Sequence, residues 1–386
     1  MAFTTFNTVS RIVHDRGSIQ ALPDEIRRLD RNASKVLIVS DPGIKGVGIL
    51  DRVAAILSGA GLASGIFSEV KSDPAFDVAR ASVAFARECK PDIVVGIGGG
   101  SSLDTAKLTA VMLGNPDPIE NYVGMDLVEN PGVPLILIPT TAGTGSEVTS
   151  ICVLSDTVSQ IKKAVVSPYL YARSVLLDPE LTVALPPHIT ATTGVDALVH
   201  AIESFSGIRA TAFTDALNIQ AIALIGANLR RAYRDGADHE ARKNMLFASC
   251  ITGMAFSNTQ NGLDHALALA LGGKYHLPHG LLTAFLCPWV MEFNLPAAKE
   301  KYARIALAMG EDTAGLSNEK AAGLAVKAVR ALLEDLNIPT RLSAHGIPSD
   351  EFPAVAKATV GAVRLISNNP RKVTEADVVA LLEANY

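Results

Sequence analysis

The sequence predicts an α/β domain with a Rossmann-like parallel sheet, followed by an all-α domain. Up to about residue 185, short apolar runs rich in β-branched residues alternate with helical segments, the pattern of a parallel sheet with helices on both faces. After Pro186 no convincing strand pattern follows, and helical segments continue to the last residue. The 386 residues also exceed what one hydrophobic core usually serves. We therefore predict two domains, residues 1–185 and residues 186–386.

Four apolar runs predict the strands of the first domain. Helical segments stand between them, so consecutive strands are expected to run parallel. The predicted strands are residues 35–41, 65–70, 92–100 and 134–139, and the predicted helices are residues 53–61, 75–89 and 102–113. Ligands of such sheets bind at the carboxyl ends of the strands. The loops that follow these strands are therefore the expected binding loops.

The second domain is predicted from apolar residues that recur at helical spacing. Thr374 and Asp377 resemble a capping box at the start of the last helix. Gly272 and Gly273 are expected to end an earlier helix, because glycine is frequent just after a helix. The predicted helical segments are residues 194–204, 214–236, 241–258, 261–273, 296–310, 319–336 and 374–386.

Composition and charge favour a small-molecule ligand over nucleic acid or a membrane. Hydrophobic residues make up 48% of the chain, the formal net charge is −5, and no run rich in lysine or arginine occurs. The four cysteines are widely spaced, which argues against a disulfide framework and against a thiolate zinc site. The N-terminal residues lack the apolar core of a signal peptide, and no uninterrupted apolar run of about 18 residues occurs. We expect a cytoplasmic protein.

One carboxylate and three imidazoles predict a metal site in the second domain. Asp196 and His200 are four residues apart in a run of helix formers, so both side chains leave one helical face. His265 lies in a second helical segment, and His279 follows a proline where a third helix begins. Three helical segments could therefore converge on one ion.

Three neutral imidazoles and one carboxylate suit Fe(II) or Zn(II) and are too rich in nitrogen for magnesium or calcium. Each of these residues taken alone is more often a satisfied core or surface side chain. The Asp-x-x-x-His spacing also occurs by chance in many helices. Only the combination of the four residues supports a metal site.

A glycine-rich turn stands where a predicted strand ends and a helix begins, in residues 96–107 (GIGGGSSLDTAK). Glycines allow the backbone close to a ligand, and the free N–H groups of a helix N-terminus favour phosphate. A tight strand-to-helix turn is the competing interpretation. It explains one or two glycines, but it explains less easily three glycines in a row followed by two serines. The predicted pyrophosphate contacts are Gly98, Gly99, Gly100, Ser101 and Ser102.

A second loop, PTTAGTGSEVT (residues 139–149), follows the next predicted strand. The hydroxyls of Thr140, Thr141, Thr144 and Ser146 could donate to a phosphate or a ribose. A plain connecting loop is the competing interpretation, and this loop alone does not decide between them.

Asp41 ends the first predicted strand. Its carboxylate could accept hydrogen bonds from an adenosine ribose and repel a 2′-phosphate, which would select NAD over NADP. It could equally be the first residue of an ordinary Asp-Pro-Gly turn.

Taken together, these motifs resemble the iron-dependent, or group III, alcohol dehydrogenases. GGGSSLDTAK, PTTAGTGSEVT, GVDALVHAIESF, FTDALNIQAI and YHLPHG stand in that family's order and spacing along nearly the whole chain. The resemblance implies a dehydroquinate synthase-like architecture, with an N-terminal Rossmann-like dinucleotide domain, a C-terminal helical metal domain and a substrate cleft between them.

The resemblance also implies roles for individual residues. Asp196, His200, His265 and His279 would be the metal ligands, residues 98–102 would hold the pyrophosphate, and the three threonines of the second loop would line the nicotinamide side. Lys163 matches a family lysine near the cofactor, although by itself a solvated lysine in a hairpin is the better interpretation.

The chain departs from the family beside the third predicted ligand. Many relatives have His-x-x-x-His-Pro where this chain has His265, Leu269 and Ala270, so a second histidine near the substrate is missing. Asp264, just before the ligand, is also unusual. His276 is then a neighbour of the metal site and a candidate proton relay, in place of the missing histidine.

The resemblance implies hydride transfer between a small alcohol and NAD, assisted by a metal acting as a Lewis acid. A maleylacetate-type or other carbonyl reductase of the same superfamily, and a non-catalytic NAD- or metal-binding sensor, are the alternatives. A homodimer or higher homo-oligomer is expected on general grounds. The particular alcohol and the choice between iron and zinc do not follow from these residues.

Overall fold

The computed structural model describes residues 4–157, 161–275 and 277–386. The chain divides into two compact units, a sheet unit of Asn7–Ala184 and a helical unit of Leu185–Tyr386. The few described residues before Asn7 belong to the helical unit. The predicted boundary had assigned these N-terminal residues to the first domain. Each unit is described below by itself.

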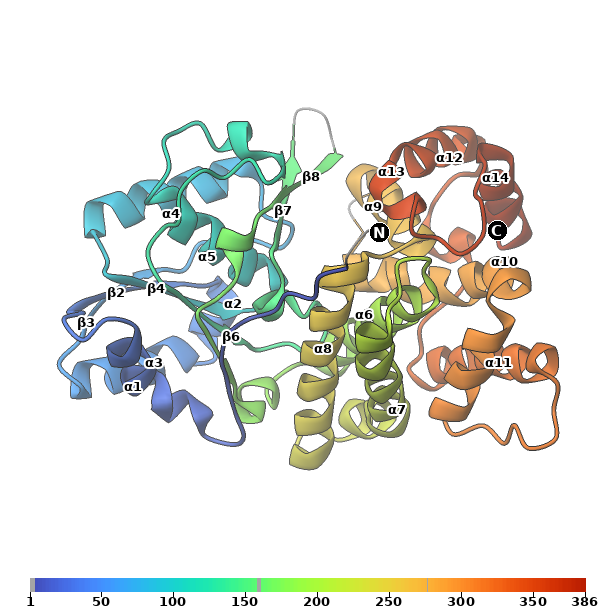
Figure 1. Cartoon of the computed structure of the whole chain (residues 1–386), viewed down its shortest axis with the longest axis horizontal. Helices are drawn as coiled ribbons and strands as arrows, with labels where there is room; N and C mark the ends of the chain where they lie inside the picture. Colours follow the sequence, from blue (N-terminus) through green and yellow to red (C-terminus); the bar gives the residue numbers. More distant parts are fainter. Residues whose placement is uncertain (1–3, 158–160, 276) are drawn as a thin grey trace. The chain divides into compact units, whose positions relative to one another are not determined.

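The sheet unit is built on a parallel sheet of six strands (Figure 1). The strand order is β1-β9-β6-β4-β2-β3, and every neighbouring pair is parallel. The strands are β1 Ile12–His14, β2 Lys35–Val39, β3 Ala63–Phe67, β4 Ile93–Gly98, β6 Leu135–Pro139 and β9 Ser174–Leu177. The four predicted strands are among them, because runs such as IVVGIG are buried on both faces and read as continuous apolar segments.

Helices cover both faces of this sheet (Figure 1). One face packs against α1 (Leu22–Leu29) and α3 (Ile49–Gly59), whose apolar residues share a core with β2, β4 and β6. The other face packs against α4 (Phe76–Cys89) and α5 (Gly100–Met112). α5 is buried on almost every side, which explains why its sequence shows no clear polar face.

A smaller sheet packs outside α4 and α5. It consists of β5 (Gly124–Met125), β7 (Ile151–Asp156) and β8 (Ile161–Val166), and β7 and β8 are antiparallel. Cys152, Leu154 and Val165 point from it into the core that α4 and α5 line. The predicted strand pattern did not include this sheet, since β7 and β8 are only half-buried and β5 has two residues.

The strand order has a switch point between β2 and β4. From β2 the chain moves to β3 on one side and afterwards to β4, β6 and β9 on the other, the 2-1-3-4-5 order of flavodoxin-like folds. Parallel strands end at one edge, so the segments after β2, β4 and β6 lie side by side. Residues 41, 98–102 and 140–146 occupy these three neighbouring strand ends.

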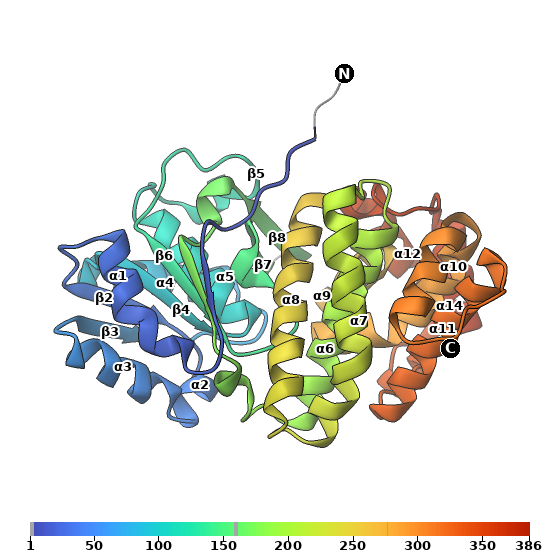
Figure 2. The same cartoon turned by 60° about the horizontal axis from the view of Figure 1, so that its bottom comes forward.

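The helical unit contains no strand among its described residues. Its helices are α6 Pro187–Ser206, α7 Ala212–Arg234, α8 His239–Thr259, α9 Leu263–Tyr275, α10 His279–Ala308, α11 Asn318–Asp335, α12 Phe352–Gly361, α13 Val363–Ile366 and α14 Glu375–Ala384. α6, α7 and α8 pack side by side (Figure 2), and α10 packs against α11, α6 and α9. The predicted capping box is confirmed, since Thr374 and Asp377 each accept the other's backbone N–H.

The predicted end of the helix at Gly272 and Gly273 is wrong, because α9 continues to Tyr275. Gly272 is buried, and a Cβ there would lie 3.1 Å from the side chain of Leu282 on α10. The glycine therefore allows α10 to approach α9 closely. It does not end the helix.

Two helices, α7 and α10, are long and apolar enough to cross a membrane by length and composition. Both pack against other helices of the unit, α7 against α6 and α8 and α10 against α11. The long apolar core helices of globular proteins have the same composition. α10 also contains Pro288 and Pro296, and its backbone is kinked at Ala298.

Candidate functional site

α6 carries a stripe of three buried polar residues on one face. Asp196, His200 and Glu203 stand at positions i, i+4 and i+7, which the 3.6-residue repeat places above one another. None is more than 6% exposed. Asp196 and His200 were predicted from the sequence, and Glu203 was not, although the same helical spacing continued into HAIES predicts it as well.

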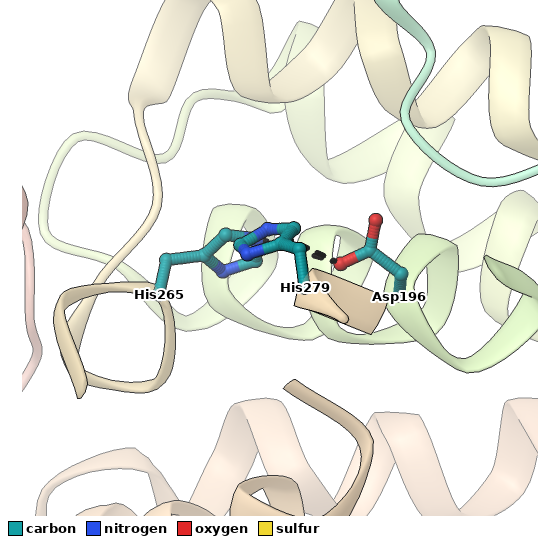
Figure 3. Close-up of side chains that lie close together, drawn as sticks. All are labelled: Asp196, His265 and His279. Carbon is teal, nitrogen blue, oxygen red and sulfur yellow. Dashed lines mark ion pairs between the residues drawn. The ribbon is translucent and has the colours of Figure 1, made fainter. Parts of the chain in front are cut away.

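α9 and α10 bring the other two predicted ligands to this stripe (Figure 3). The Nε2 atoms of His265 and His279 lie 3.8 and 3.7 Å from Oδ1 of Asp196, and the candidate ligand atoms of these three residues lie within 4.8 Å of one another. Nε2 of His200 lies 3.0 Å from Nε2 of His265. The structure thus brings all four predicted residues together.

These distances fit a single divalent ion. Ligand atoms at about 2.1 Å from one ion lie roughly 3 to 4 Å apart, and the separations of 3.8, 3.7 and 3.0 Å given above lie in that range. Nδ1 of His200 is buried, and no described residue accepts or donates a hydrogen bond there. Four nitrogen and oxygen donors of this kind suit Fe(II) or Zn(II).

The protonation states also suit an ion. Burial lowers the pKa of His200 to about 3, so its imidazole is neutral and has a free lone pair at neutral pH. Burial raises the pKa of Asp196, but the neighbouring histidines and the hydroxyl of Thr283, which donates to Oδ1 at 3.0 Å, bring it below its ordinary value. Asp196 is therefore ionised.

The four residues differ in exposure. The side chains of Asp196, His200 and His265 are 3 to 7% exposed, whereas that of His279 is 27% exposed. Phe256 covers the other side by stacking on His200 at a ring separation of 4.3 Å. The cluster is thus accessible from the side of His279, as a catalytic metal site must be.

Two positions bear on the proton route, the candidate relay His276 and Leu269, which stands where many relatives have a histidine. His276, the candidate proton relay, lies outside the described residues. Leu269 lies on α9 one turn after His265 and is half-buried. Its side chain cannot carry a proton.

The predicted pyrophosphate loop has the backbone that such a loop needs. Gly98 has φ +146°, and a Cβ there would lie 2.7 Å from Ser102 and 2.9 Å from Asp41. A Cβ at Gly100 would lie 2.8 Å from Thr144. α5 starts at Gly100, so its first N–H groups face the ends of the neighbouring strands, as anion binding requires.

Asp41 lies at the switch point and has two hydrogen bonds. Its Oδ1 accepts from the backbone N–H of Ile44 at 3.1 Å and caps α2 (Pro42–Gly46), and its Oδ2 accepts from Oγ of Ser102 at 2.9 Å. Asp41 thus has a local structural role, as the turn interpretation expected, but it is the cap of a short helix. A carboxylate has further lone pairs, so the ribose contact stays a prediction.

The residues of the threonine loop after β6 differ in their hydrogen bonding. The hydroxyl of Thr140 is buried without a described partner. Ser146, by contrast, donates to Oδ1 of Asp104 at 2.5 Å and accepts from Nζ of Lys107 at 2.7 Å. Lys107, which is fully buried, also donates to Thr149, so these residues fix the loop against α5.

Lys163 lies on β8, half-exposed, and pairs with Asp156 of β7 at 2.6 Å. The hairpin expected for a solvated lysine is thus present. Its contact with a cofactor stays a prediction.

The comparisons with known proteins cover both units. A model described as iron-containing alcohol dehydrogenase matches residues 9–179, and one described as the C-terminal part of the Fe-containing alcohol dehydrogenase family matches residues 190–386. The chain is 46% identical to sulfoacetaldehyde reductase of Bilophila wadsworthia (strain 3_1_6), covering 100% of both chains.

Solved structures agree with these matches. A crystal structure of 1,3-propanediol oxidoreductase is 35% identical, with a TM-score of 0.97 and 100% of both chains covered. Sulfoacetaldehyde reductase from Bifidobacterium kashiwanohense in complex with NAD+ is 25% identical, with a TM-score of 0.89 and coverage of 100% of this chain and 99% of that one.

Proposed function

Since the chain belongs to the iron-containing alcohol dehydrogenase family, we propose that its own metal centre is the cluster on α6, α9 and α10 and that its coenzyme is NAD. The family activity is the interconversion of a small alcohol and its aldehyde or ketone by hydride transfer. The observation that carries the proposal is the convergence of Asp196, His200, His265 and His279 within one ion's reach.

The residues present would perform three tasks. The four ligands would hold Fe(II), with Zn(II) as the alternative, and the ion when bound would supply Lewis acidity to the substrate oxygen. The glycine turn at the start of α5 would hold the pyrophosphate. Asp41 would accept from the adenosine ribose and disfavour NADP.

For the substrate we propose a short aldehyde that carries an anionic group, such as sulfoacetaldehyde. The sulfoacetaldehyde reductase of Bilophila wadsworthia matches the chain in sequence over its whole length. The sulfoacetaldehyde reductase from Bifidobacterium kashiwanohense matches all of it in structure. A cationic residue within the helical unit supports the proposal. Arg364 on α13 is half-buried, and no described residue accepts a hydrogen bond from its guanidinium.

A second cation lies beside Arg364. Arg209 donates to Oγ of Ser367 at 3.4 Å, and that hydroxyl donates to the carbonyl oxygen of Arg364 at 2.9 Å. Burial and the charge of Arg209 lower the pKa of the Arg364 guanidinium. Two neighbouring cations, neither of which pairs with a carboxylate among the described residues, form a suitable binding place for a sulfonate or carboxylate. α13 packs against α9, the helix that carries His265.

The test is a substrate panel with NADH and NADPH. We expect reduction of sulfoacetaldehyde to be faster at low concentration than reduction of propanal, to stop after chelation and to return with Fe(II) or Zn(II). Arg364→Ala should raise the KM for sulfoacetaldehyde about tenfold and leave the KM for propanal unchanged. Lys357→Ala, an exposed cation on α12, is the control. Equal KM changes for both aldehydes would exclude Arg364 as the anion contact.

We also infer a cytoplasmic homodimer. Among the described strands, β1 pairs with β9 alone and has a free edge at which a second copy could add its own strand. Light scattering of the purified protein measures the assembly directly, and a monomer at micromolar concentration would contradict the inference.

A further inference from the structure

We propose that Glu203 is a positioning residue that sets the orientation and the tautomer of His265, and thereby the metal affinity of the centre. The proposal rests on the metal centre proposed above. Glu203 itself does not lie among the four donors, so its influence would pass through His265.

The carboxylate of Glu203 makes three hydrogen bonds to one short segment. Its Oε2 bonds Nδ1 of His265 at 2.7 Å and accepts from the backbone N–H of Gly262 at 2.9 Å, and its Oε1 accepts from the backbone N–H of Asp264 at 2.7 Å. Glu203 and His265 are 62 residues apart in the chain. α6 thus holds the start of α9 through a single side chain.

These contacts fix how His265 presents its ring. Two backbone N–H groups already use the carboxylate as an acceptor, so the ring nitrogen that faces it carries the hydrogen. Nδ1 is then the protonated nitrogen, and the lone pair is on Nε2. Nε2 is the atom that faces Oδ1 of Asp196 and Nε2 of His200. A histidine whose second nitrogen donates to a carboxylate is held in the ligating tautomer and is a stronger ligand.

The same carboxylate caps α9. The first N–H groups of a helix have no partner within the helix, and a negative charge near them is favourable. Glu203 accepts from the N–H groups of Gly262 and Asp264 at this end, and Oδ1 of Asn369 accepts from that of Leu263 between them at 3.4 Å. The backbone that carries His265 is therefore anchored to the helix that carries Asp196 and His200.

Gly262 makes the approach possible. A Cβ at this position would lie 3.0 Å from Oε1 of Glu203 and 3.2 Å from Oδ1 of Asn369. Such a Cβ would push the carboxylate away from His265 while leaving its charge in place. Gly262→Ala is therefore a second way to disturb the contact.

The experiment measures metal affinity by competition with a chelator, using Zn(II) and Fe(II) added to metal-free protein. In Glu203→Gln one oxygen becomes an NH2 group that must face a donor, either a backbone N–H or Nδ1 of His265. We expect a 10- to 100-fold loss of metal affinity, a smaller loss in Gly262→Ala, and unchanged NADH binding by fluorescence in both. Glu300→Gln, an exposed glutamate on α10, is the control and should match the wild type.

A Co(II)-loaded sample gives a readout that stability alone would not move. A changed ligand geometry at His265 should alter the visible absorption of bound Co(II) in Glu203→Gln and in Gly262→Ala. Unchanged affinity and spectrum in the variants, with a wild type that binds one ion, would overturn the role of Glu203 and leave the proposed function intact. A wild type that binds no ion would overturn the proposed function itself. Gly262→Ala decides the question if Glu203→Gln does not fold.

Discussion

The two candidate sites of this protein are built from different materials. The proposed metal centre of the helical unit consists of side-chain donors that come from three helices, and its backbone is ordinary helix. The loops of the sheet unit consist largely of backbone, with glycines at close approaches and with N–H groups at the start of α5. A metal ion requires particular atoms, whereas a pyrophosphate requires a shape lined with N–H groups. Substitutions should therefore act differently in the two units.

The largest effect is expected for His265→Ala. It removes one ligand and leaves Glu203 without its imidazole partner, so metal retention and alcohol oxidation should fall by at least about a thousandfold. NAD affinity should change little, because the proposed cofactor loops belong to the sheet unit. Metal analysis after dialysis and NADH fluorescence measure the two quantities. A variant that keeps its metal would contradict the ligand assignment.

The next effect concerns pH and the threonine loop of the sheet unit. Burial raises the pKa of Glu147, which is 1% exposed, from 4.5 to about 7, although the charge of Lys107 lowers it. The folded protein therefore holds this proton more tightly than the unfolded chain. Stability should fall as pH rises from about 4.5 to about 7 and change no further above that range.

Glu147→Gln removes the titrating group and should abolish this pH dependence. The gain in unfolding free energy at pH 8 stays below roughly 4 kcal/mol, the energy that corresponds to a pKa raised from 4.5 to about 7. Urea unfolding of both proteins at pH 5 and pH 8 provides the measurement. An equal loss of stability between the two pH values in wild type and variant would show that Glu147 is not responsible.

A moderate effect is expected for Gly98→Ala. The residue has a positive φ, and its added Cβ would contact Ser102 and Asp41, so the turn before α5 must shift. NADH should bind about tenfold more weakly, while metal content is unchanged. Gly59→Ala is the matched control, because Gly59 lies at the end of α3 with nothing within 4 Å of the added Cβ. A loss of metal in Gly98→Ala would contradict the expectation that the two sites respond independently.

The smallest effect is expected for Asp41→Gly. The change removes the carboxylate that would repel a 2′-phosphate, so the ratio of NADP to NAD use should rise severalfold. It also removes the cap of α2 and the acceptor for Ser102, which should weaken binding of both coenzymes alike. Only the change in the ratio tests the ribose contact, and an unmoved ratio would leave Asp41 as a turn residue.

Much of this molecule follows from short stretches of sequence. Apolar β-branched runs between helical segments predicted the parallel sheet, because each strand buried on both faces must be apolar throughout. The Asp-x-x-x-His pair placed two donors on one face of α6, since helical periodicity is a local property. The glycine turn at residues 98–100 also followed locally, because its backbone needs residues without a Cβ.

Other features depend on contacts between distant segments, and only the tertiary structure decides them. Nothing near Glu203 in sequence shows that its carboxylate meets His265, and nothing near Lys107 shows that it holds Ser146. Gly272 looked like a helix end but serves the packing of α10 against α9. Local periodicity indicates which face of a helix or strand is apolar. The partner of each buried polar group is fixed only when the whole chain packs, because satisfying such groups is a condition on the complete fold.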